Sequence, residues 1–97
     1  MTKLTKTGEH SWYFEGDLTF KTVPKMLPEC PEVAATETVI VDLSGLRLGD
    51  SAALSLLVEW MAIAQKNGGV ICYIKLPTNL KRLAHVLGLD FLKSDTE

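Results

Sequence analysis

The sequence has few cysteines, no long apolar run and little net charge, and each shortage excludes a class of protein. Cys30 and Cys72 are its only cysteines, and they do not form a C-x-x-C pair. Two distant thiols fit a reducing compartment, so we expect neither a disulfide nor a metal site from them. The longest mostly apolar stretch, Ala52 to Ala64, is interrupted by Ser55 and Glu59 and is too short to span a bilayer.

The charge and the length restrict the protein further. The formal net charge of -2 comes from 10 basic and 12 acidic residues without long runs, so we expect no nucleic-acid partner. The N-terminal segment "MTKLTKTGEH" has no apolar core of the kind that a secretory signal needs, and this favours a cytoplasmic location. The 97 residues predict a single domain over 1–97, and a content of 46% apolar residues can fill its core.

The middle of the chain predicts one strand–helix–strand unit between Thr38 and Leu76. The segments "TETVIVDLSGL" and "VICYIKL" have the continuous apolar character of buried strands. Between them a helix is predicted from Asp50 or Ser51 to Gln65 or Lys66, ended by "NGG". The two strands should therefore be parallel, with a right-handed crossover.

The flanking segments add to this unit. The stretch "HSWYFEGDLTF" begins with a β-rich run, and its "EGD" predicts a turn or a bulge. This hairpin-like segment should add antiparallel strands. The apolar residues Val23, Met26 and Leu27 then recur at helical spacing and predict a short helix. Near the C-terminus, "TNLKRLAHVLG" predicts an amphipathic helix. The segment "LDFL" is interpreted as a last short strand or a docking turn. The predicted fold is a small α/β sandwich with a mixed sheet and helices mainly on one face.

The long helix has a wider apolar surface than contact with one sheet requires. At about 100° per residue, the helix has one narrow polar stripe, and the residues that fall within it are Ser51, Ser55, Glu59, Ala62 and Lys66. Leu57 and Trp60 near the middle of the apolar arc should be core residues. The flanks of the arc are Leu54, Val58 and Met61 on one side and Leu56 and Ile63 on the other. Neighbouring helices could cover these flanks, or another protein could dock on them.

The start of this helix is the main candidate site. Asp50 and Ser51 are both good N-cap residues, so helix capping alone would explain them. An exposed Ser51 hydroxyl at the positive end of a helix would also favour a phosphate or a partner group. "SGLRLGD" lacks the pattern of a P-loop, and the sequence has neither a G-x-S-x-G motif nor a recognisable metal-ligand set. We therefore expect no enzymatic activity, no cofactor and no metal.

These segments resemble a STAS domain, the module shared by sulfate transporters and anti-sigma-factor antagonists. "FEGDLTFKTVPKML" looks like the first strand, turn and helix of that family. "TVIVDLSGLRLGDSAALSLLVEWMAIAQKNGG" looks like its central strand, signature loop and long helix. The signature Asp-Ser-Ser/Thr-Gly-Leu is matched by Asp50 to Leu54, with Ala52 and Ala53 in place of the second hydroxyl and the glycine. Small residues at these positions make the chain most similar to the MlaB group.

The resemblance implies a function, a partner and a set of site residues. It implies a cytoplasmic accessory subunit of a phospholipid-transporting ABC system, bound to its MlaF-like ATPase subunit and so indirectly to an inner-membrane permease. The implied partner-binding or regulatory residues are Asp50, Ser51, Leu54, Ser55 and Val58. Two alternatives stay open: an anti-sigma-factor antagonist switched by phosphorylation of Ser51, and a self-contained lipid- or nucleotide-binding protein.

Overall fold

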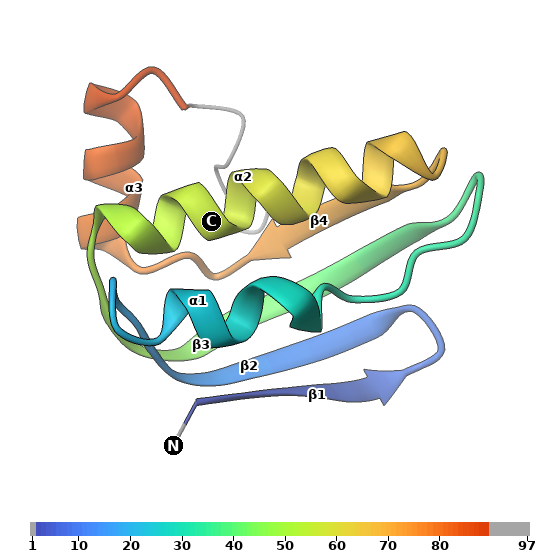
Figure 1. Cartoon of the computed structure of the whole chain (residues 1–97), viewed down its shortest axis with the longest axis horizontal. Helices are drawn as coiled ribbons and strands as arrows, with labels where there is room; N and C mark the ends of the chain where they lie inside the picture. The colour runs from blue at the N-terminus through green and yellow to red at the C-terminus, as the bar shows by residue number, and fades with distance from the viewer. Residues whose placement is uncertain (1, 90–97) are drawn as a thin grey trace.

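One four-stranded sheet with helices packed against it forms the molecule, in a computed structural model that describes residues 2–89 (Figure 1). The strands follow the order β1-β2-β3-β4 across the sheet. The elements are β1 (Lys3–Gly8), β2 (Ser11–Leu18), α1 (Val23–Met26), the 3₁₀ helix η1 (Leu27–Glu29), β3 (Thr38–Gly49), α2 (Ser51–Lys66), β4 (Val70–Ile74) and α3 (Thr78–Val86).

The sheet is mixed, as predicted. β3 and β4 are parallel on either side of α2, which confirms the strand–helix–strand unit. β1 and β2 form an antiparallel hairpin, but β2 pairs in parallel with β3 because the chain crosses back through α1. The "EGD" segment is not a turn: it continues β2, and the extra residues of the irregular pairing lie opposite it in β3, between Asp42 and Gly45 and between Leu46 and Leu48. The register of β2 against β3 shifts on both sides of Gly16, whose φ of 113° is strained for other residues.

The boundaries of the helices follow local signals. Asp50 caps the first turn of α2, and its last turn is closed by Asn67 followed by Gly68 with a left-handed φ of 86°. The short α1 continues into η1, because Pro28 removes the N–H that another helical turn would need. The "LDFL" prediction falls mostly on residues 90–92, which lie outside the described residues.

The core lies between α2 and one face of the sheet. Its largest fully buried side chains are Trp60, Phe14, Leu18, Leu43, Leu54, Leu56, Leu57, Leu80, Val39 and Val41. The core assignments of Leu57 and Trp60 are therefore confirmed. Val58, Met61 and Ile63 are partly buried and pack against the core. Because α2 contacts α1, η1, α3 and β4, neighbouring elements cover both flanks of its apolar arc.

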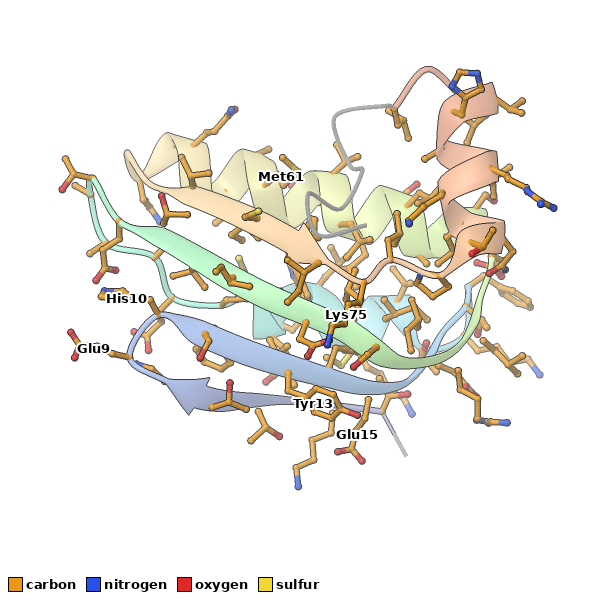
Figure 2. All side chains as sticks on the ribbon, turned by 180° about the vertical axis from the view of Figure 1, so that it is seen from behind. Glu9, His10, Tyr13, Glu15, Met61 and Lys75 are labelled. Atoms are coloured by element: carbon orange, nitrogen blue, oxygen red, sulfur yellow. The ribbon has the colours of Figure 1, made fainter. Side chains whose placement is uncertain are left out.

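The other face of the sheet is covered by none of the described helices (Figure 2). Ile40 of β3 and Val70 of β4 are exposed there, on strand positions that alternate with buried Val39, Val41 and Ile71. The molecule therefore has a helical side and a bare side of the sheet. The candidate site lies where α2 begins, at one end of the helical side.

Candidate functional site

Asp50 holds two separate segments together at the start of α2. One carboxylate oxygen, Oδ1, accepts a hydrogen bond of 2.9 Å from the Ala52 N–H, which caps the helix. The other, Oδ2, accepts a hydrogen bond of 3.3 Å from the N–H of Phe20, in the loop between β2 and α1. The Asp50 N–H in turn donates to the carbonyl of Leu18 at 3.3 Å. One side chain therefore fixes the β2–α1 loop against the first turn of α2.

Ser51 is the first residue of α2, and its side chain is exposed. Its carbonyl accepts from the Ser55 hydroxyl at 3.5 Å, whereas the Ser51 hydroxyl bonds to no residue within 2–89. The capping interpretation is thus correct for Asp50 and wrong for Ser51. A neutral hydroxyl is left at the positive end of a sixteen-residue helix, where hydrogen-bond acceptors and anions are favoured.

The other predicted partner-binding residues divide into two groups. Ser55 is exposed one turn after Ser51, and Val58 is half-buried. Leu54 is only 1% exposed, so its assignment to a partner surface needs correction. It points into the core because α2 is covered on both flanks, which the angular pattern of one helix cannot reveal. The accessible polar stripe near the site is therefore limited to Ser51 and Ser55.

Two exposed apolar residues at this end of the molecule were missed by the sequence analysis. The side chain of Phe20 is 71% exposed, and that of Leu48 is 52% exposed. Period-two alternation from Leu18 would place Phe20 on the core face if β2 continued. The strand ends at Leu18, however, and the following turn directs the chain away from the sheet. The only available signal was the Thr-Phe-Lys-Thr segment between the strand and Pro24, which reads equally well as a strand end.

A hollow of about 410 Å³ opens beside this loop, between β2 and α1. Its lining consists of Thr2, Asp17, Thr22, Lys25 and Met26. Asp17 forms an ion pair of 2.8 Å with Arg47 through Oδ2, and its buried Oδ1 has no hydrogen-bond partner among residues 2–89. Among the described residues that line this hollow, Lys25 alone has a basic side chain. A second hollow, of about 440 Å³, lies at the opposite end of the sheet, and its lining includes Glu9, Glu32 and Glu37.

The arrangement suits binding better than covalent catalysis. His10 lies 2.8 Å from the Glu37 carboxylate at the far end of the sheet, opposite α3 (Figure 2), and so cannot act as a base for Ser51. The Ala34 N–H and, secondly, His10 lower the pKa of Glu37 through hydrogen bonds.

Within the described part of the chain, no three His, Cys, Asp or Glu side chains gather in a way that could hold a metal ion. No helix of residues 2–89 is long and apolar enough to cross a membrane.

Comparison with known families decides the classification. The family model described as "Mlab, STAS domain" matches residues 14–93, which include the second half of β2, the signature loop and all of α2. The chain belongs to the MlaB-type STAS domains. In this STAS domain the signature loop is the β3–α2 junction, so the family motif and the exposed hydroxyl coincide at Ser51.

Solved structures of STAS domains share its fold. The anti-sigma factor antagonist SpoIIAA, in its unphosphorylated form, superposes with a TM-score of 0.60 and 13% identity, over 88% of this chain and 82% of that chain. An anti-sigma factor antagonist from Mycobacterium paratuberculosis superposes with a TM-score of 0.57 and 17% identity, over 99% and 86%. The search of curated proteins found no match. At these identities the likeness concerns the fold alone.

Proposed function

We propose that this STAS domain is a non-enzymatic accessory subunit that binds and regulates the ATPase subunit of a lipid-transporting ABC complex. The observation on which this proposal depends is the exposed Ser51 hydroxyl at the start of α2, inside the segment that matches the MlaB-type family model. Because Asp50 already caps the helix, the Ser51 hydroxyl is available to a partner.

The surroundings of Ser51 support a role in protein contact. The hydroxyl is held on the end of a helix that Leu54, Leu57 and Trp60 anchor in the core, so the position of the Ser51 main chain is fixed before a partner binds. A neutral hydroxyl loses little when an interface excludes water, provided that the partner supplies one hydrogen bond. Exposed Phe20 and Leu48 supply apolar surface at the same end of the molecule.

The second candidate is an anti-sigma-factor antagonist that a kinase switches by phosphorylating Ser51. Its support is again the exposed hydroxyl, since a phosphate there would sit at the positive end of α2. The two solved structures described above are those of anti-sigma factor antagonists, one of them in its unphosphorylated form. The adjacent residue is Ala52 rather than a second hydroxyl, and this favours the accessory-subunit proposal.

Affinity purification of the tagged chain from its native host tests the proposal. We expect recovery of an ABC ATPase with its permease, and a change in the rate of ATP hydrolysis when the purified chain is added back to the purified ATPase. The chain alone should hydrolyse no ATP. Recovery of a switch kinase and its sigma factor, without any ABC ATPase, would instead establish the second candidate.

A further inference from the structure

Hydrogen bonds order the loop that carries Phe20. Five successive main-chain N–H groups, from residue 19 to residue 23, each have an acceptor. The pairs are Thr19 N–H to Thr22 Oγ1 at 3.0 Å, Phe20 N–H to Asp50 Oδ2 at 3.3 Å, Lys21 N–H to Thr19 Oγ1 at 3.3 Å, Thr22 N–H to Thr19 O at 3.0 Å, and Val23 N–H to Thr19 O at 2.9 Å. Thr22 Oγ1 also donates to the Asp17 carbonyl at 2.8 Å.

This rigid loop holds a large aromatic side chain in water. Phe20 is 71% exposed although its main chain is fixed on both sides. A partner that buried Phe20 would gain the apolar area while losing little loop entropy, because the loop is already ordered. Buried aromatic anchors of this kind supply much of the binding free energy in protein interfaces. Since Asp50 joins this loop to α2, Phe20 and Ser51 would approach a partner as one unit.

The charges beside Phe20 indicate the chemistry of that partner. Lys21 and Lys25 form no ion pair with any residue of 2–89. Among residues 2–89, Asp17 is paired with Arg47, and Asp50 keeps its negative charge but is turned toward two main-chain N–H groups. Lys21 and Lys25 therefore contribute positive charge without an ion-pair partner beside an apolar centre, although the whole chain has a formal net charge of -2. Complementary charge on a partner would be acidic.

We infer that Phe20, Lys21, Lys25, Leu48 and Ser51 form a docking surface, here called the Phe20 surface. Its occupant is an apolar pocket bordered by Asp or Glu carboxylates on the ATPase subunit. Phe20 enters the pocket, Lys21 and Lys25 pair with the carboxylates, and Ser51 makes a hydrogen bond at the margin. This inference rests on the proposed function for the identity of the partner, and it adds the loop residues that anchor the contact.

Binding measurements on the reconstituted complex test the surface. Phe20→Ala should raise the Kd for the purified ATPase at least tenfold, and Lys21→Glu should raise it by about tenfold at low salt and by less at high salt. Val70→Thr is the matched control, because Val70 is also exposed but lies on the bare sheet face at the opposite end of the molecule. All three variants should keep the melting temperature of the free domain. Unchanged affinity in Phe20→Ala would overturn the inference.

A photo-reactive phenylalanine analogue placed at position 20, and separately at position 70, identifies the contact directly. We expect a cross-link from position 20 to an ATPase peptide that contains apolar and acidic residues, and none from position 70. A cross-link to the ATPase from position 70 alone would overturn the Phe20 surface and leave the proposed function intact. If the unmodified chain binds no ABC ATPase, both proposals fail.

A lipid surface is the competing occupant, because an aromatic residue beside lysines also suits anionic headgroups. Vesicles of phosphatidylcholine with phosphatidylglycerol provide the probe. We expect no Phe20-dependent binding to them, since the surface has only two unpaired lysines and a single large aromatic side chain. Vesicle binding that Phe20→Ala abolishes would assign the surface to lipid and overturn the protein-partner inference.

Discussion

The hydroxyl of Tyr73 in β4 donates a hydrogen bond of 2.7 Å to the main-chain carbonyl of Leu57 in α2. Both residues belong to the core, and Leu57 lies in the middle of the long helix. The bond therefore ties the centre of α2 to the sheet at a point that water does not reach. It also gives a polar atom in the core a partner, which burial makes necessary.

Tyr73→Phe should destabilise the domain by about 1 kcal/mol, because it removes a buried hydrogen bond but keeps the ring that fills the core. Unfolding in guanidinium chloride measures the change. Tyr13→Phe is the control, since Tyr13 is partly exposed, and it should shift the free energy of unfolding by less than about 0.5 kcal/mol. Equal effects of the two substitutions would contradict this account.

The same tyrosine predicts a loss of stability at alkaline pH. Burial, and secondly the neighbouring Cys30, raise the pKa of Tyr73 well above its ordinary value of 10.0. In the unfolded chain Tyr73 releases its proton near that value, while the folded protein retains it. The contribution of Tyr73 to the free energy of unfolding is thus fully present below pH 10 and declines as the pH rises above that value. Unfolding free energies between about pH 9 and pH 11 should fall more steeply in the natural protein than in Tyr73→Phe. Parallel curves would exclude this cause.

Asp50→Ala should destabilise the domain by about 1 to 2 kcal/mol, because the Ala52 and Phe20 N–H groups lose their shared acceptor. Asp50→Asn keeps an acceptor oxygen and should retain most of the stability. Amide hydrogen exchange offers a more local measurement: the Phe20 amide should exchange faster in Asp50→Ala than in Asp50→Asn. Equal protection in the two variants would show that Asp50 does not order the loop.

Ser51→Ala and Ser51→Asp should both leave the free domain folded, with changes within about 0.5 kcal/mol for Ala and a slight stabilisation for Asp beside the positive end of the helix. The reason is that Asp50, not Ser51, forms the cap. Binding to the ATPase should weaken more in Ser51→Asp than in Ser51→Ala, because a carboxylate must be desolvated on docking. Thermal melts and affinities of the same two variants check this. Unchanged affinity in both would remove Ser51 from the interface.

The sequence predicted those parts of the fold whose signals are local. Asp50 before an apolar helix and Asn67-Gly-Gly after it gave α2 its correct bounds, and the apolar runs on either side gave β3 and β4. The sequence did not predict where β1 begins and ends. As an edge strand it lacks the alternation of buried and exposed residues that marks an inner strand. The parallel pairing of β2 with β3 depends on a crossover through the short α1, which no spacing in the sequence encodes.

The candidate site was only half predictable for a similar reason. The family motif located Asp50 and Ser51, since their roles depend on the first turn of one helix. Leu54 was misassigned and Phe20 was missed, because the exposure of each depends on elements far away in the sequence. Leu54 is covered by neighbours that pack on α2, and Phe20 is held outward by a hydrogen bond to a residue 30 positions later.

The start of β1 has a practical consequence for anyone who attaches a label to this protein. Thr2 exchanges hydrogen bonds with the main chain of Asp17 and lines the hollow beside Lys25. The start of β1 therefore lies at the same end of the sheet as the start of α2 (Figure 1). A fluorophore or affinity handle fused there would crowd the approach of a partner and imitate a binding defect. The β1–β2 turn at Glu9 and His10 lies at the far end of the sheet, which makes it the safer point of attachment.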